Sequence, residues 1–339
     1  MRYHPRAGFT YMPSTRLRLQ GGEGGYLVRT NQAGFRSDRE FVAERVEGSR
    51  RALLFGDSQT AGDGVPNARR YSDLVEAARP DLEIYNYAVS GTGTDQQFLT
   101  YQDQRSVAHD LVVIALYVEN IRRISRRILK SRDADGEWSL RAKPYYELVD
   151  GDLVLRNVPV PKQAWTEETL PREHLPYVYS YEDSLFFDAP SGRQAAMLRT
   201  LIPAGPVRRA AKAIVGPFRS FEPLPEYRSP DDPSWLLLRA LLTSWIAQSA
   251  APVLVVTIPH ATSLTGTSDP SSYQARFREL ARETGCHLYD PLPDLLGSPV
   301  EARREMWSSS YGHLSARGHE AMARALEPVV GDLLHAHGR

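Results

Sequence analysis

The 339-residue chain has a single cysteine, Cys286, which excludes an internal disulfide framework and any cysteine-rich metal site. It also has no excess of charge of either sign, because 41 basic and 41 acidic side chains give a formal net charge of zero. Phosphate binding needs a basic surface, so this balance argues against a nucleic acid as partner. No histidine and carboxylate cluster has metal-ligand spacing, and we expect neither a metal nor a cofactor. Cys286 lies in the apolar run GCHLYD and is expected to be a buried structural thiol.

Long apolar stretches are missing as well. No run approaches the roughly 20 apolar residues that a helix needs to cross a bilayer. The N-terminal sequence MRYHPRAGFTYMPSTRLRLQ lacks the apolar region of a secretory signal, so we expect a cytoplasmic protein without a membrane span. The hydrophobic content of 42% is still enough for a sizeable core, in one large domain or two ordinary ones. The sequence does not indicate an oligomeric state.

Short apolar runs alternate with helical patterns along most of the chain. Near-continuous apolar runs are typical of parallel strands that are buried on both faces. Strands are expected at 52–55, 82–89, 111–118, 252–259 and, with a weaker pattern, 286–290. Helices are expected at 71–80, at 233–250, at 272–285 between an N-cap at Ser272 and Gly285, and at the C-terminus, where Pro328 should break or kink the helix. This alternation predicts an α/β fold with a mostly parallel sheet and helices on both faces.

Residues 122–232 interrupt this rhythm and are interpreted as an insertion. The segment opens with the basic, helix-like run RRISRRILKSR, and the DGD of YYELVDGDLVLRNVPVP is typical of a β-hairpin turn. Open α/β folds bind ligands at the carboxyl edge of the sheet, and we expect the insertion to lie over that edge as a lid or cap. The chain is thus divided into a lead-in at 1–49 packed on the core, an α/β domain at 50–121 and 233–339, and the insertion.

Polar groups follow three of the expected strands, and a fourth lies in a loop near the C-terminus. The first strand ends in GDS, which places Ser58 at the carboxyl end of the sheet just before a helix. A serine hydroxyl becomes an effective nucleophile only with a base in hydrogen-bond reach and with donors for the oxyanion. The next two strands are followed by Gly91, which can present its N–H, and Asn120, which can present its amide. The sequence GHLSARGH offers His313 as the base.

These four blocks resemble the SGNH (GDSL) hydrolase superfamily, whose members are serine esterases and acyl-transferring relatives. GDS, VSG, VEN and GHLSARGH occur in the family order. The resemblance implies a flavodoxin-like, three-layer α/β/α fold, with Ser58 as the nucleophile and His313 as the base. It also implies an oxyanion hole formed by the N–H groups of Ser58 and Gly91 and by Nδ2 of Asn120. The lead-in sequence TNQAGFRSDREF at 30–41 resembles that of a bacterial subgroup with a large insertion.

The blocks depart from the family pattern in two places. The third block usually reads Gly-x-Asn-Asp and here reads VENI, which keeps the asparagine. The family also usually has an aspartate three residues before the histidine, where this chain has Ser310. Two arrangements remain open. Either a Ser58–His313 dyad is oriented by Ser310 or a backbone carbonyl, or a displaced carboxylate such as Glu305 or Asp294 completes the triad.

These residues predict a serine esterase that cleaves an O-acyl ester on a small sugar-containing or secondary-metabolite molecule through an acyl-Ser58 intermediate. One alternative is an acyltransferase that passes the same acyl group to an alcohol or amine, while the insertion excludes water. A second alternative is a catalytically degenerate member that binds a ligand without turnover, as the missing aspartate would allow. The basic run that begins with Arg122 and Arg123 is interpreted either as a solvated helix face or as a site for an anionic substrate or a carrier-borne acyl group.

Overall fold

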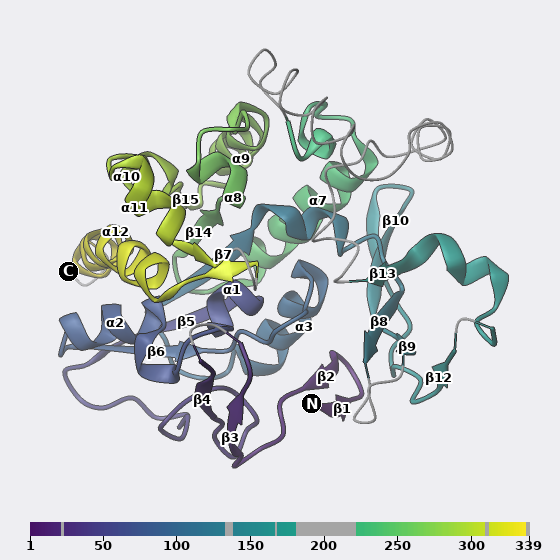
Figure 1. Cartoon of the computed structure of the whole chain (residues 1–339), viewed down its shortest axis with the longest axis horizontal. Helices are drawn as coiled ribbons and strands as arrows, with labels where there is room; N and C mark the ends of the chain where they lie inside the picture. The colour runs from purple at the N-terminus through teal and green to yellow at the C-terminus, as the bar shows by residue number, and fades with distance from the viewer. Residues whose placement is uncertain (22–23, 133–137, 167, 181–221, 309–311, 337–339) are drawn as a thin grey trace.

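A five-stranded sheet forms the centre of the molecule, which is a computed structural model that describes residues 1–21, 24–132, 138–166, 168–180, 222–308 and 312–336 (Figure 1). Its strands are β5 (Arg50–Gly56), β6 (Leu82–Asn86), β7 (Leu111–Tyr117), β14 (Val253–Ile258) and β15 (His287–Tyr289). All neighbouring strands are parallel, in the order β15-β14-β7-β5-β6. The five predicted strands are confirmed, although β6 ends at Asn86 rather than at residue 89.

Helices cover both faces of this sheet. Alternating side chains of β5 point to opposite sides, so Leu53 and Phe55 join one core while Ala52 and Leu54 join the other. The first core is completed by α3 (Thr94–Gln104), α7 (Pro233–Gln248) and α9 (Ser271–Thr284). The second core is completed by α2 (Tyr71–Ala78), α8 (Ala261–Leu264), α10 (Leu292–Leu296) and α12 (Ala316–Ala336). The fold is therefore the predicted three-layer α/β/α arrangement with a flavodoxin-like strand order.

The C-terminal helix α12 runs without a break through Pro328, so the predicted break is wrong. A proline inside a helix removes one backbone hydrogen bond. However, α12 buries Leu326 before the proline and Val330 and Leu334 after it, in the same core. Packing therefore holds both halves of the helix against the sheet. No helix in the described parts of the chain is long and apolar enough to cross a membrane.

Helix α9 begins one residue earlier than predicted and without Ser272 as its cap. The side chain of Asp269 accepts a hydrogen bond from the Ser271 N–H at 2.9 Å, which satisfies the start of the helix instead. The predicted end is confirmed, because Gly285 has the left-handed conformation that stops many helices. Cys286 follows directly, is half-buried and packs against the first core, and burial raises the pKa of its thiol.

The described part of the insertion forms strands where the basic run predicted a helix. β8 (Ile128–Arg132), β9 (Trp138–Ala142), β12 (Ala164–Trp165) and β13 (Val178–Ser180) form one sheet, and β10 (Tyr145–Val149) pairs with β11 (Asp152–Arg156). The helix prediction is wrong over 128–132, because β8 pairs with β9 there. Ile128 of β8 is buried in a small apolar cluster with Leu140 and Ala142 of β9. The hairpin turn predicted at DGD is confirmed. Asp150 and Gly151 both have positive φ, as a two-residue type I′ turn requires.

The insertion packs beside α3 and α7, on one side of the core (Figure 1). Tyr146 of β10 lies 5.9 Å from Phe98 of α3 between ring centroids, and both belong to the cluster that contains Trp245 of α7. Residues 181–221 lie outside the described residues, so the lid or cap stays a prediction.

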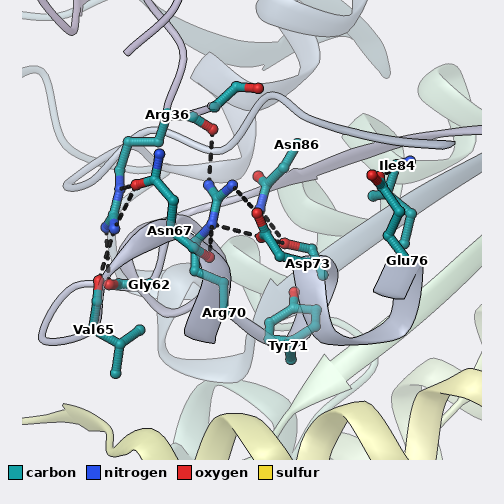
Figure 2. Close-up of polar contacts among 12 residues, drawn as sticks. Arg36, Gly62, Val65, Asn67, Arg70, Tyr71, Asp73, Glu76, Ile84 and Asn86 are labelled. Carbon is teal, nitrogen blue, oxygen red and sulfur yellow. Dashed lines mark hydrogen bonds and ion pairs between the residues drawn. The ribbon is translucent and has the colours of Figure 1, made fainter. Parts of the chain in front are cut away.

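The lead-in forms two hairpins, β1 (Arg2–His4) with β2 (Gly8–Thr10) and β3 (Arg16–Leu19) with β4 (Tyr26–Arg29). After them, the buried Arg36 donates hydrogen bonds to the carbonyl groups of Gly62 and Val65 at 2.8 and 2.7 Å, and to the side chain of Asn67 (Figure 2). Arg36 thereby fixes the loop that follows the short helix α1 (Ser58–Ala61).

Candidate active site

Ser58 is the first residue of α1, directly after the carboxyl end of β5. Asp57 caps this helix, because its carboxylate accepts a hydrogen bond from the Gln59 N–H at 3.0 Å. The link from strand to helix is tight: a Cβ at Gly56 would collide with the side chain of Thr60. Ser58 is consequently held in one position at the edge of the sheet, where it is almost fully buried.

The two other predicted oxyanion groups lie at the ends of the neighbouring strands. Gly91 follows β6 and has a φ of +81°, a conformation that glycine adopts at little cost. Asn120 lies after β7 in the 3-10 helix η2 (Val118–Arg122) and is fully buried. Its amide faces Asp57 and helps to lower the pKa of that carboxyl group, but neither Nδ2 nor Oδ1 forms a hydrogen bond of normal geometry within the described residues. Buried amides nearly always have partners, so this one fits a donor role towards a substrate oxygen.

His313 reaches the same edge from the C-terminal part of the chain. It is buried in β17 (His313–Leu314), which pairs with β16 (Trp307–Ser308). Gln59 holds this strand from both sides. Its Nε2 donates a hydrogen bond to the Gly312 carbonyl at 3.2 Å, and its Oε1 accepts one from the Leu314 N–H at 3.0 Å. Gln59, the residue after Ser58, therefore fixes both neighbours of the candidate base His313. This role was not predicted from the sequence.

The residues considered for the third triad position are not brought together with His313 by any described contact. Ser310 lies outside the described residues. Glu305 ends α11 (Val300–Glu305), is exposed and forms an ion pair with Arg317. Asp294 accepts a hydrogen bond from the Tyr289 hydroxyl at 2.5 Å. Both acids thus have partners of their own near the surface.

Arg122 and Arg123 bond to protein groups rather than forming a solvated helix face, so that interpretation is wrong for these two residues. Arg122 forms an ion pair with Glu226 at 2.6 Å. Arg123 is 3% exposed and forms a buried ion pair with Asp57 at 3.1 Å. A role for either arginine in binding an anionic substrate stays a prediction.

Two buried carboxyl groups interact electrostatically at this edge, Asp57 directly before Ser58 and Glu119 after β7. Burial raises the pKa of Asp57, whereas Arg123, the Gln59 N–H and the charge of His313 act in the opposite direction. Burial also raises the pKa of Glu119 in η2, against the opposing effect of Arg123. Carboxyl groups with a shifted pKa at the same sheet edge as a serine and a histidine are typical of functional sites.

A scan against protein-family models gives no match for this chain, and a search of curated proteins gives none either. Solved structures do match. A member of the lipolytic G-D-S-L family from Veillonella parvula is 11% identical, with 84% of this chain and 99% of that chain covered and a TM-score of 0.42. The acetylxylan esterase Axe2 from Geobacillus stearothermophilus is 14% identical, with 84% and 95% covered and a TM-score of 0.41. At these identities and TM-scores, the likenesses are too remote to carry an argument.

The chain's own topology decides the fold. Ser58, Gly91 and Asn120 follow three adjacent strands of one parallel sheet, and Gln59 joins the strand of His313 to the same edge. The chain has a flavodoxin-like α/β/α fold, as the resemblance to the SGNH hydrolases implied. Within this fold, the candidate site lies where the strand order reverses between β5 and β7, which is where open α/β sheets bind their ligands.

Proposed function

We propose that the protein is a serine esterase that hydrolyses an O-acyl ester through an acyl-Ser58 intermediate. The proposal rests on three features at one sheet edge: a serine at a helix start, a buried amide without a normal hydrogen bond among the described residues, and a histidine strand bonded to Gln59, the serine's neighbour. A serine at a helix start is often only a cap. The amide and the histidine add the oxyanion donor and the base that acyl transfer needs.

In this reaction Ser58 Oγ attacks the ester carbonyl carbon while His313 takes its proton. The oxyanion accepts hydrogen bonds from the N–H groups of Ser58 and Gly91 and from Nδ2 of Asn120. Collapse of the tetrahedral intermediate breaks the bond to the alcohol, which receives the proton from His313, and leaves the acyl group on Ser58. Water then attacks the acyl-enzyme with His313 again as base, which releases the carboxylic acid and restores the serine.

We further propose that His313 works without a triad aspartate, oriented by Ser310 or by a backbone carbonyl. Glu305 and Asp294, the two alternative acids, already have other partners. The substrate class is a small O-acyl ester of a sugar-containing or secondary-metabolite alcohol.

Ser58→Ala tests the proposal with p-nitrophenyl acetate as substrate. The variant should lose at least ~10³-fold in kcat, because the nucleophile is gone, and keep the Tm of the wild type. Ser72→Ala is the matched control, since Ser72 is an equally buried serine that lies in α2. Unchanged hydrolysis by a folded Ser58→Ala variant would rule out the serine mechanism. Adding alcohol or amine acceptors to the wild type separates hydrolysis from acyl transfer.

A further inference from the structure

Arg123 connects the three chain segments that carry the oxyanion groups. It directly follows η2, and its backbone N–H donates a hydrogen bond to the Asn120 carbonyl at 2.9 Å. Its guanidinium group donates to Asp57 Oδ2 at 3.1 Å and to the Thr92 carbonyl at 3.4 Å. Asp57 directly precedes the nucleophile, and Thr92 directly follows the oxyanion glycine. One residue therefore bonds to the segments that follow β5, β6 and β7.

The ion pair between Arg123 and Asp57 also sets the charge beside the nucleophile. The two side chains are 3% and 0% exposed, so water screens their interaction very little. An uncompensated carboxylate at Asp57 would repel the negative charge that develops on the substrate oxygen. The positive charge of Arg123 offsets the negative charge of Asp57 and so reduces this repulsion.

The backbone of Arg123 is supported by Lys143, a residue farther along the insertion. Lys143 lies between β9 and β10 and forms a fully buried ion pair with Asp95 near the start of α3. Its ammonium group also donates hydrogen bonds to the carbonyl groups of Arg123 and Arg126 at 3.4 and 3.1 Å. Lys143 thus restrains the segment that carries Arg123 and keeps the guanidinium group against Asp57.

We propose that Arg123 is a positioning residue of the oxyanion hole: it holds the segments of Ser58, Gly91 and Asn120 together and neutralises Asp57. This inference rests on the proposed esterase function. Arg123 does not touch the substrate and acts only through the groups that it binds. This role is an alternative to the prediction that Arg123 binds an anionic substrate.

The inference predicts a pH-dependent defect when the guanidinium group is removed. The titratable and charged groups that face Asp57 are, in addition to Arg123, Glu119 in η2, Tyr117 in β7, Tyr71 in α2 and His313 in β17. In Arg123→Met, Asp57 loses its main counter-charge, so its pKa rises further. As the pH rises, Asp57 ionises beside the oxyanion, and kcat should gain a descending limb that the wild type lacks.

At pH 8 we expect Arg123→Met to lower kcat by ~10²-fold, with KM changed by less than about threefold. Arg123→Lys retains a positive charge and should recover part of the loss. The double variant Arg123→Met with Asp57→Asn removes both charges but keeps a good helix cap, so it should recover kcat and lose the descending limb. The double variant and Arg123→Lys keep the test decisive even if Arg123→Met folds poorly.

Arg51→Met is the matched control for a buried arginine. Arg51 lies near the opposite end of β5, is fully buried and pairs with Glu83 at 2.7 Å. Its loss should lower the Tm without changing kcat per folded molecule. The inference is overturned if the Arg123 variants alter kcat no more than Arg51→Met does, or if the double variant keeps the defect. Labelling of wild-type Ser58 by diisopropyl fluorophosphate separates the two failures, because an unlabelled wild type would overturn the esterase proposal itself.

Discussion

Buried polar groups at the amino ends of the parallel strands, the amino edge of the sheet, are more fully bonded than those at the carboxyl ends, the carboxyl edge. At the amino edge, Arg51 donates hydrogen bonds to Glu83 and to four backbone carbonyls, those of Val42, Ala43, Glu44 and Ala108. Burial acts to raise the pKa of Asp110 at that edge, but hydrogen bonds from Arg45 and from the Arg51 backbone outweigh it and lower the pKa. At the carboxyl edge, the pKa of Asp57 stays raised despite its ion pair, and the Asn120 amide has no hydrogen bond of normal geometry to the part of the chain that the structure describes.

This difference distinguishes polar groups that stabilise the fold from polar groups that take part in the proposed reaction. Fully bonded polar groups at the amino edge contribute to folding stability. Buried groups that are only partly compensated cost folding free energy, and they persist where a reaction uses them. Substitutions at well-bonded positions should therefore change stability, whereas substitutions of the partly compensated groups should change catalysis.

The largest contrast is expected between two buried asparagines. Asn120→Ala should lower kcat by ~10²–10³-fold, the usual cost of one lost oxyanion donor, with little change in unfolding free energy. Asn67 is its control, because its side chain is fully bonded to Arg36 and to the Arg29 carbonyl. Asn67→Ala should cost ~1–3 kcal/mol of stability and leave kcat unchanged. If Asn120→Ala raises only KM, Asn120 is a binding or capping residue.

A smaller effect is expected at Gln59, which holds both neighbours of His313. Gln59→Leu keeps the size of the side chain but removes both hydrogen bonds, so the imidazole should lose its alignment with Ser58. We expect kcat to fall by ~10–10²-fold at unchanged KM, because small displacements of a catalytic group lower the rate of the chemical step. Steady-state kinetics with thermal unfolding checks this, and a lower Tm with normal kcat would assign Gln59 to folding alone.

The smallest effect concerns His319, six residues from His313 in the same motif. Burial lowers the pKa of His319 to about 3, and Nδ1 of its ring accepts a hydrogen bond from the Tyr71 N–H at 3.2 Å. The unfolded chain binds a proton at this histidine near pH 6.5, whereas the folded chain does not until about pH 3. Stability should therefore fall as the pH drops below 6.5, by at most ~1.4 kcal/mol per pH unit from this group.

His319→Gln should flatten that dependence and keep the wild-type kcat at neutral pH. Urea unfolding of both proteins at pH 7 and pH 5 measures the difference. An identical change in stability between the two pH values in wild type and variant would show that His319 is not the group responsible.

The sheet could be predicted because strands that are buried on both faces have continuous apolar sequences. The end of β6 could not, because Tyr87 and Val89, beyond its last residue, are also buried and still donate backbone hydrogen bonds to β5. The segment 128–132 was predicted as a helix because its pairing partner, the following strand β9, lies outside the basic run. Local pattern alone cannot show where a strand's hydrogen bonds go.

The positions of Ser58, Gly91 and Asn120 at one edge could be predicted, because parallel strands all end on the same side. The roles of Gln59 and Arg123 could not. Gln59 binds partners 253 and 255 residues away, and Arg123 binds Asp57 across 66 residues. A basic run has the same sequence pattern whether it faces water or a buried carboxyl group.

The most direct test of the central claim, that the carboxyl edge holds an activated serine, is covalent labelling. The folded wild-type protein is treated with diisopropyl fluorophosphate, and the modified residue is located by peptide mass spectrometry. The account predicts one adduct, on Ser58, formed more slowly in His313→Gln and absent in Ser58→Ala. An unmodified Ser58 in the folded wild type, or labelling at the same rate in His313→Gln, would contradict it.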